Sequence, residues 1–293
     1  MNENNKKFRL YSFLIILAVY LAAFFIGWVV VYLLKDLNLL LATFIADMAA
    51  TIVVWIFGII FKNASVYDPY WSVAPVFIAS FWIIKLNAFY PAALLFLGAF
   101  LIWGTRLTVN WASRWKGLSH QDWRYGMIKD KNPKMWFLSN LFGINIIPTL
   151  FVFLGLTPVY YAFLIKTSFS VLSIFGFVVC IGAVFLQIFS DRQMDLFKIS
   201  KNKEKPYIET GLWRYSRHPN YFGEVTFWWG IWIIGTGANT KAWITIIGPI
   251  AMTLLFFFIS IPMMEKYVIS SKPGYLEYKK KVSMLFIWFR KEN

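Results

Sequence analysis

The sequence predicts an all-α membrane protein, a polytopic bundle of about eight transmembrane helices with both termini on the cytoplasmic side. Of its 293 residues, 59 % are hydrophobic and only 15 % are charged, whereas about one-quarter of a soluble domain is charged. Apolar runs of about 20 residues recur along the chain, and each is long enough to cross a hydrocarbon core roughly 30 Å thick. Because no water satisfies backbone polar groups there, each run is expected to be helical.

Eight apolar runs give the expected transmembrane helices in chain order. They lie at about 10–34, 40–61, 71–84, 89–105, 137–164, 169–190, 222–237 and 242–262. The third and fourth runs are short, and the fifth is long and contains Pro148 and Pro158, so the expected count lies between about seven and nine. No repeat or flexible linker divides the chain, and we expect one integral membrane domain over residues 1–293.

Basic residues are distributed unevenly between the two ends of these helices. With the N-terminus in the cytoplasm, 25 of the 29 Lys and Arg residues fall on the cytoplasmic side. The four in outer loops are Lys35, Lys85, Lys166 and Lys241. This is the positive-inside pattern, and it accounts for the net charge of +15. We therefore expect membrane lipids as neighbours and no nucleic acid, with the bacterial inner membrane as the location if the source is bacterial.

Cysteine and histidine are too rare to build a disulfide or a histidine-rich metal site. The single cysteine, Cys180, lies in an apolar run, where we interpret it as a packing residue, and the two histidines are His120 and His218. No metal is expected. The polar residues 1–9 precede an apolar run that is too long for the core of a signal peptide, and we interpret this run as the first transmembrane helix.

Three polar segments, at about 106–136, 191–221 and 263–293, are expected on the cytoplasmic side. The last contains Lys279–Lys281 and then an apolar stretch, 284–289, and is expected to lie on the membrane surface. Charged residues within or beside the helices are costly and indicate function. They are Asp47, Asp68, Arg106, Asp191, Asp195, Glu224 and Glu265. The simpler explanation for Asp47 is a hydrogen bond to a neighbouring helix.

The most informative stretch is GLWRYSRHPNYFGE at 211–224, where a basic loop broken by proline enters an apolar helix. Arg214, Arg217 and His218 offer several hydrogen-bond donors. The planar guanidinium of arginine suits phosphate or carboxylate groups. This stretch therefore predicts a binding site for an anionic group at the membrane face.

Aromatic and polar residues of the same stretch extend that prediction. Tyr215 and Tyr221 can stack on a ring, which favours a large cofactor that is both anionic and aromatic. A basic loop on anionic lipid headgroups is the simpler alternative. That alternative explains the arginines, but it does not explain why Asn220, Gly223 and Glu224 stand where they do.

The run Arg-His-Pro-Asn-Tyr-Phe-Gly-Glu at 217–224 resembles the C-terminal signature of the steroid 5-alpha-reductase-like membrane reductases and of the sterol C14 and delta-7 reductases. A shorter Arg-His-Pro-x-Tyr-x-Gly core also occurs in the isoprenylcysteine carboxyl methyltransferases. The resemblance covers about 60–293. Stretches that favour the bacterial, largely uncharacterised reductase branch are 103–107, 122–125, 190–193, Glu265 and 274–278.

The resemblance implies a reductase that holds NADPH at the cytoplasmic face and reduces a carbon–carbon double bond of a lipid-like enone, of steroid or isoprenoid type. Asp191, with Lys198 seven positions on, resembles the family's acidic and basic cofactor-binding pair. Asn220 and Glu224 match its cofactor-contacting Asn and Glu, and Tyr278 matches its C-terminal Tyr. The chain has no Gly-x-Gly-x-x-Gly loop, so a Rossmann domain is not indicated.

The resemblance also implies a catalytic carboxylate. The steroid reductases carry a Gln-Glu pair with a proline seven residues after the Glu, and this chain has Tyr67-Asp68 and Pro75 at that spacing. Asp68 is therefore expected to polarise the substrate carbonyl, as an acid whose pKa is raised by apolar surroundings. The family's partner tyrosine aligns with Trp103, whose indole can donate a hydrogen bond but supplies no proton. Tyr70 is a possible substitute.

Three alternatives stay open. Asp68 could cap the start of the following helix near Ser72. The chain could be a methyltransferase that uses S-adenosylmethionine and binds its carboxylate and adenine with the 211–224 loop. It could also be a lipid-binding membrane protein without a cofactor. Stabilisation of the purified protein by NADPH, by S-adenosylmethionine or by neither distinguishes these functions.

Overall fold

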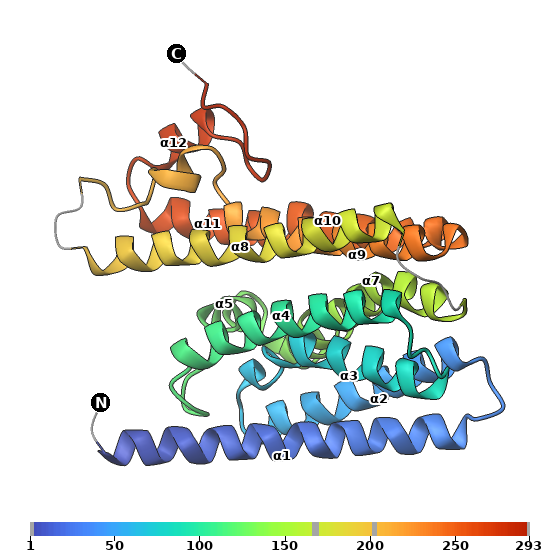
Figure 1. The fold of residues 1–293 in the computed structure, drawn as a ribbon. Helices are drawn as coiled ribbons and strands as arrows, with labels where there is room; N and C mark the ends of the chain where they lie inside the picture. The colour runs from blue at the N-terminus through green and yellow to red at the C-terminus, as the bar shows by residue number, and fades with distance from the viewer. Residues whose placement is uncertain (1–2, 166–169, 201–203, 292–293) are drawn as a thin grey trace. The chain divides into compact units, whose positions relative to one another are not determined.

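The structure is a computed structural model that describes residues 3–165, 170–200 and 204–291. The α-helices are α1 (Glu3–Leu33), α2 (Leu39–Ile60), α3 (Tyr70–Lys85), α4 (Pro91–Arg114), α5 (Trp123–Lys131), α6 (Trp136–Leu138), α7 (Ile147–Phe163), α8 (Val171–Ile199), α9 (Pro219–Ala238), α10 (Ile247–Leu255), α11 (Ile261–Ser271) and α12 (Tyr275–Lys281). Short 3-10 helices are η1 (Ala64–Val66), η2 (Pro133–Met135), η4 (Gly211–Arg214) and η5 (Thr240–Ile246), and π-helices are η3 (Ser139–Ile146) and η6 (Phe256–Ser260). Figure 1 shows this helical architecture, which confirms the all-α prediction for the described residues.

Six helical stretches are long and apolar enough to cross a membrane. They are Glu3–Leu33, Leu39–Ile60, Pro91–Arg114, Pro133–Phe163, Val171–Ile199 and Thr240–Ser271. They match six of the eight expected runs, and they indicate an integral membrane protein. The other two runs are helices as well, but α3 has only 16 residues and α9 carries Asn220 and Glu224 in its first turns. The number of spans and the side of the termini stay predictions, and Lys166 lies outside the described residues.

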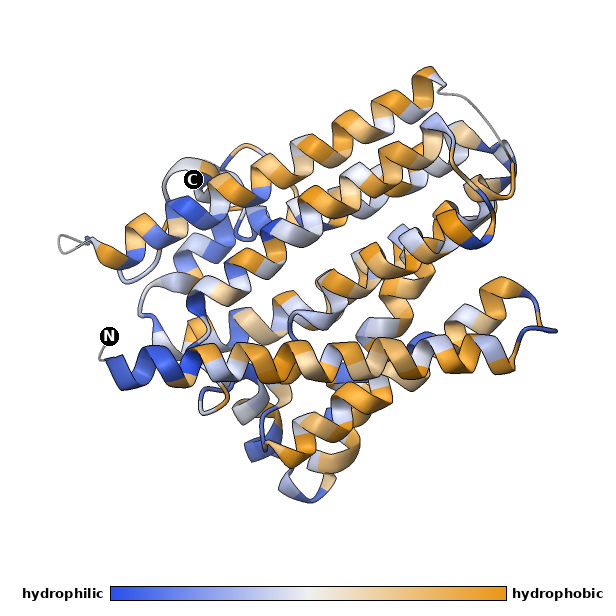
Figure 2. Cartoon of the chain, turned by 60° about the horizontal axis from the view of Figure 1, so that its bottom comes forward, coloured by the Kyte–Doolittle hydropathy of each residue, from blue (hydrophilic) through white to orange (hydrophobic). Residues whose placement is uncertain are grey.

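Apolar side chains cover the outer surface of the long helices. In Figure 2, α1 is hydrophobic along most of its length and hydrophilic in its first turns, next to the N-terminus. Its exposed side chains include Leu14, Leu17, Leu21 and Phe25. A soluble protein rarely exposes so continuous an apolar surface, whereas a lipid-facing helix requires one.

The chain folds into two compact units. Unit 1 comprises residues 1–82 and 103–153, and unit 2 comprises residues 83–102 and 154–293. The expectation that they act as one membrane domain stays a prediction.

In unit 1, α1 and α2 form an antiparallel pair that meets through small residues (Figure 1). Asn38 begins α2, where its side-chain Oδ1 accepts a hydrogen bond from the Leu40 amide at 2.9 Å. A Cβ atom added at Gly27 would lie 3.5 Å from the Ala46 carbonyl oxygen and 3.8 Å from the Ala50 Cβ. Small residues allow such close contact between helices in lipid, where van der Waals packing replaces the hydrophobic effect.

In unit 2, α8 and α9 run antiparallel and pack through residues spaced by seven. Gly223, Gly230 and Gly237 of α9 face Gln187, Cys180 and Ser173 of α8. A Cβ atom at Gly230 would lie 2.5 Å from the Cys180 sulfur, so the two backbones approach as closely as glycine permits. Cys180 is fully buried in this interface, which confirms the interpretation of Cys180 as a packing residue.

Candidate functional site

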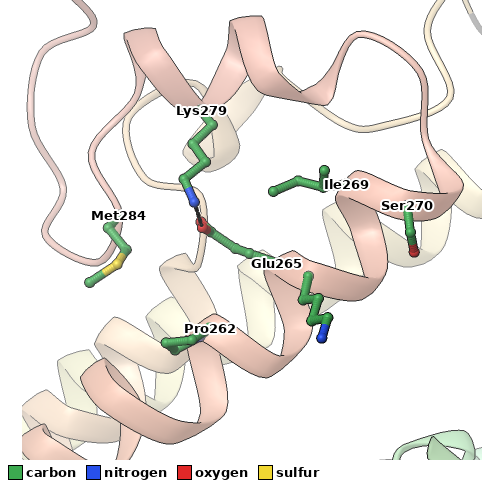
Figure 3. Close-up of a pocket in the computed structure, with 7 residues that line it drawn as sticks. Pro262, Glu265, Ile269, Ser270, Lys279 and Met284 are labelled. Carbon is green, nitrogen blue, oxygen red and sulfur yellow. Dashed lines mark ion pairs between the residues drawn. The ribbon is translucent and has the colours of Figure 1, made fainter.

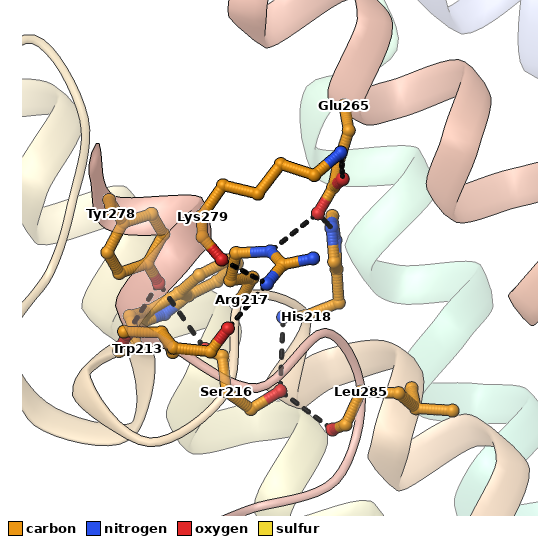
Figure 4. Close-up of polar contacts among 9 residues, drawn as sticks. Trp213, Ser216, Arg217, His218, Glu265, Tyr278, Lys279 and Leu285 are labelled. Carbon is orange, nitrogen blue, oxygen red and sulfur yellow. Dashed lines mark hydrogen bonds and ion pairs between the residues drawn. The ribbon is translucent and has the colours of Figure 1, made fainter. Parts of the chain in front are cut away.

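The start of α9 and the C-terminal segment meet at a buried carboxylate in unit 2, Glu265 of α11 (Figure 4). Its Oε1 lies 2.6 Å from the Arg217 Nε and 3.4 Å from the His218 Nε2. Its Oε2 lies 2.8 Å from the Lys279 Nζ. We call these four residues the Glu265 cluster. Burial lowers the pKa of His218 although Glu265 acts in the opposite direction, so we expect this imidazole to be neutral at pH 7.

Arg217 uses most of its donors within unit 2. Its Nη1 donates to the Lys279 carbonyl oxygen at 2.9 Å and to the carbonyl oxygen of Val282. Its backbone amide donates to the Ser283 carbonyl oxygen at 2.9 Å. Only 6 % of the residue is exposed. Arg217 therefore ties the 211–218 loop to α11 and to the segment after α12.

Backbone contacts extend this junction. The Ser216 hydroxyl donates to the Leu285 carbonyl oxygen at 2.7 Å and accepts from the His218 amide at 3.1 Å. The Trp288 amide donates to the Tyr215 carbonyl oxygen at 3.1 Å. The segment expected to lie on the membrane surface is thus folded against the loop, while Phe286, Trp288 and Phe289 remain exposed.

The C-terminal tyrosine belongs to the same junction. Tyr278 is buried, and its hydroxyl donates to the Trp213 carbonyl oxygen. The Trp213 indole in turn donates to the Ser190 carbonyl oxygen at 3.2 Å, at the polar end of α8. Tyr278, Arg217 and His218, all predicted to contact the cofactor, are therefore brought together by the fold, and each has its polar groups engaged by protein partners.

A second group of predicted residues lies at the start of α9. The Asn220 Nδ2 lies 3.4 Å from the Asp191 Oδ1, so the fold brings these two predicted cofactor residues together within unit 2. Glu224 is buried and accepts a hydrogen bond from the Trp228 indole at 3.2 Å. Tyr221 stacks on His218 with ring centroids 5.4 Å apart.

The remaining predicted cofactor residues are exposed. Arg214 closes η4, Tyr215 follows it, and Lys198 lies in the last turn of α8. Exposed cations at such a position can reach a bound anion, whereas the Arg217 guanidinium is committed to Glu265. Their contact with a cofactor stays a prediction.

A pocket of about 490 Å³ lies beside the Glu265 cluster (Figure 3). Pro262, Ile269 and Met284 give it an apolar lining, and Lys266 also lines it. Figure 3 shows Lys279 reaching across from α12 to its ion pair with Glu265. The pocket thus combines an apolar surface with cations.

Unit 1 holds the predicted catalytic residues. Asp68 lies between η1 and α3, where its Oδ1 accepts a hydrogen bond from the Tyr125 hydroxyl. Ser65 also hydrogen-bonds to this carboxyl group. The Arg124 guanidinium is nearby, but it donates to Asp122 at 2.8 Å and 3.0 Å. The described side-chain contacts of Asp68 do not include Ser72, whose hydroxyl donates to the Pro69 carbonyl oxygen.

The loops around Asp68 are held by an interlocking set of bonds. The Asn63 Nδ2 donates to the Leu118 and His120 carbonyl oxygens at 2.7 Å and 3.1 Å. The Asp122 amide donates to the Ser65 hydroxyl at 2.9 Å. Burial raises the pKa of the half-buried Asp68 to about 6, and Arg124 limits the rise. The raised pKa that the sequence predicts is therefore confirmed.

The other two predicted catalytic residues lie elsewhere in unit 1. Tyr70 donates to Asp47 at 2.8 Å, which confirms that Asp47 bonds to a neighbouring helix. Trp103 is fully buried in α4, with its ring edge-on to Trp71 at 6.2 Å. The phenol that contacts Asp68 is Tyr125, which sequence reasoning did not select. Tyr125 and Asp68 are 57 positions apart, so no local pattern could predict their contact. The one sequence feature that pointed to Tyr125 was its place in the 122–125 stretch that resembles the reductase branch.

Comparison with known proteins places the chain in a family. Residues 54–282 match a family described as a protein of unknown function, DUF1295. An uncharacterised protein of Schizosaccharomyces pombe is 26 % identical over 267 residues, which cover 80 % of this chain and 75 % of that protein. The Protein-S-isoprenylcysteine O-methyltransferase of Saccharomyces cerevisiae is 33 % identical over 90 residues, 30 % of this chain and 36 % of that enzyme. No solved structure matches. The chain belongs to the DUF1295 family, which is related to the steroid 5-alpha-reductase-like proteins.

Proposed function

We propose that this protein is an NADPH-dependent membrane reductase that reduces a carbon–carbon double bond of a lipid-like enone. The observation that carries the proposal is the Asp68–Tyr125 pair. Reduction of an enone requires a proton as well as a hydride, whereas methyl transfer to a carboxylate requires no proton donor. A carboxyl group with a pKa of about 6, bonded to a phenol, can take up and release protons near neutral pH.

The residues of unit 2 have the chemistry that such a cofactor requires. Arg214 and Lys198 are exposed cations suited to phosphate groups. Asn220 and Asp191 offer an amide and a carboxylate for hydroxyl groups. When bound, NADPH would supply the hydride for the β-carbon of the enone. In this proposal the Glu265 cluster builds the loop that presents these groups.

The Asp68–Tyr125 pair would act on the enone oxygen. A protonated Asp68 or the Tyr125 hydroxyl would donate a hydrogen bond that strengthens as negative charge develops on that oxygen, which lowers the barrier. The pair would then release one proton, which completes the saturated ketone at the α-carbon. The Asn63 and Ser65 contacts hold the loop in place, so the carboxyl group needs little reorganisation.

A methyltransferase that uses S-adenosylmethionine is the second candidate. The similarity to the yeast methyltransferase over 90 residues favours it, as does the Arg-His-Pro core that the two families share. In that function the loop would bind a carboxylate and an adenine, and Asp68 would have no proton to transfer.

Ligand stabilisation of the purified full-length protein tests the two candidates. We expect saturating NADPH to stabilise it, by about 2.7 kcal/mol at a concentration one hundred times the Kd. Stabilisation by S-adenosylmethionine instead would favour the methyltransferase. Stabilisation by neither would leave a lipid-binding protein without a cofactor.

A further inference from the structure

Five buried side chains of unit 1 form an uninterrupted series of hydrogen bonds. Asp47 accepts from the Tyr70 hydroxyl at 2.8 Å, and Tyr70 also bonds to the Thr51 side chain. The Thr51 Oγ1 lies 3.0 Å from the Thr149 Oγ1, which lies 2.8 Å from the Tyr67 hydroxyl. None of the five residues is more than 5 % exposed. We call this series the hydroxyl chain.

The hydroxyl chain joins a polar loop to the inside of a candidate transmembrane helix. At its outer end, Tyr67 precedes the half-buried Asp68 in the loop between η1 and α3. At its inner end, Asp47 lies about 20 Å from the C-terminal end of α2, at 1.5 Å per residue. The series therefore leads from the residue next to the partly exposed Asp68 to a buried carboxyl group inside α2.

Asp47 has no cationic partner among the residues that the structure describes. Its polar contact is with Tyr70, and no Lys, Arg or His pairs with it. A carboxylate within a membrane is costly without a counter-ion, so the neutral acid is favoured. Each hydroxyl group of the chain can donate one hydrogen bond and accept another, so all the links can point toward Asp47 at once.

We propose that Asp47 is a reversible proton-binding site, loaded from the polar loop through the hydroxyl chain. A proton taken up at the Tyr67 oxygen releases the Tyr67 proton to the next oxygen, and each hydroxyl repeats the step. The last transfer, from Tyr70, protonates the carboxylate of Asp47. Each O–H bond that breaks is replaced by one that forms, and no electron is transferred. This inference goes beyond the reductase proposal, because it requires neither NADPH nor an enone.

Infrared spectroscopy of the full-length protein in phospholipid nanodiscs tests the proposal without any substrate. At pH 8, where Asp68 is ionised, we expect a carbonyl stretch from a protonated carboxyl group that Asp47→Asn removes. Transfer from H2O to D2O should shift this band as the proton exchanges. Thr149→Val removes the links to Thr51 and Tyr67, and Tyr67→Phe removes the link to Thr149 alone. Each variant should slow the exchange by about tenfold or more.

Ser80→Ala is the matched control, because this α3 hydroxyl donates to the Val76 carbonyl oxygen of its own helix at 2.7 Å and lies outside the hydroxyl chain. It should leave the exchange rate unchanged. If the parent lacks the band, Asp47 is ionised and the proposal is overturned. If the band exchanges equally fast in the parent, Thr149→Val and Tyr67→Phe, the bonds serve only to hold the helices together. NADPH binding is measured separately, so either failure is distinguishable from failure of the reductase proposal.

Discussion

Two carboxyl groups, Glu265 in unit 2 and Asp68 in unit 1, have opposite electrostatic environments. Glu265 is buried and has Arg217 at 2.6 Å and Lys279 at 2.8 Å, so its charge is fully compensated. Asp68 is half-buried and bonds to the neutral Tyr125, while the nearby Arg124 is committed to Asp122. Glu265 holds a loop together as a carboxylate, whereas Asp68 has a pKa of about 6 and exchanges its proton just below neutral pH.

These opposite environments separate residues of the 217–224 run that stabilise the structure from residues that can take part in a reaction. The 217–218 dipeptide begins the run at 217–224 on which the family resemblance was based, yet both side chains are buried against Glu265. A shifted pKa in a group whose charge is not fully neutralised by a partner is more typical of a functional residue. Asp68 has such a pKa. The same carboxyl-to-amide substitution should therefore have different effects at the two positions.

The largest effect is expected from Glu265→Gln. It leaves the buried Arg217 without its counter-charge, which typically costs about 3–5 kcal/mol of stability. Denaturant unfolding of the detergent-solubilised protein measures this loss. Glu277→Gln is the control, since Glu277 is exposed and forms a surface ion pair with Lys280. It should change stability little. Equal stability of Glu265→Gln and the parent would show that the Glu265 cluster does not hold the loop.

Much of the fold could be predicted because hydropathy acts locally. Every expected apolar run corresponds to a helix, since a chain in lipid has to satisfy its backbone polar groups within each helix. Pro148 and Pro158 signalled an irregular fifth span. The position of the π-helix at Ser139–Ile146 could not be predicted from the sequence. Pro148 lacks a backbone hydrogen-bond donor, but this does not determine how the preceding turns rearrange.

The site was harder to predict, because its partners lie far apart in sequence. Glu265 contacts Arg217, 48 residues earlier. The hydrogen bond of Asp68 to Tyr125 spans 57 residues. Sequence reasoning identified the charged residues by their cost in a membrane, but no local pattern tells which charges neutralise one another. The cofactor assignments of Arg217 and His218 therefore stay predictions.

The next largest effect should be on catalysis. Asp68→Ala should lower turnover by about 10²–10³-fold, and Asp68→Asn by less, because the amide keeps a hydrogen-bond donor but not the acidity. Both variants should bind NADPH like the parent. Single-turnover hydride transfer to an enone measures the effect. Asp130→Asn, at an exposed position of α5, is the control, and a similar loss there would remove the special role of Asp68.

A smaller effect is expected for cofactor affinity. Arg214→Ala should weaken NADPH binding by about 1.5–3 kcal/mol through loss of a charge-assisted hydrogen bond, with little change in stability because Arg214 is exposed. Asn220→Ala should also weaken it. Arg214→Lys keeps the charge and should retain part of the affinity. Titration by thermal stabilisation measures each Kd, and unchanged binding in both alanine variants would identify the loop as a contact for lipid headgroups.

The smallest effect has the opposite sign and concerns stability at Asp68. Its pKa in the folded protein is about 6, above the ordinary value of about 3.9. Between these values the folded state binds more protons than the unfolded state, so the free energy of unfolding falls as pH rises from about 4 to 6. At pH 7 the ionised Asp68 therefore destabilises the fold.

Asp68→Asn removes this cost, because an amide carries no charge and its oxygen still accepts the Tyr125 hydrogen bond. We expect a gain of about 1–2 kcal/mol at pH 7 that disappears near pH 4. Unfolding at the two pH values measures it. A loss at pH 7, as in Glu265→Gln, would mean that the ionised Asp68 is a structural partner of Arg124. A gain in stability accompanied by lower turnover is what a residue kept for chemistry should show, because Asp68 would then be retained in spite of its cost to the fold.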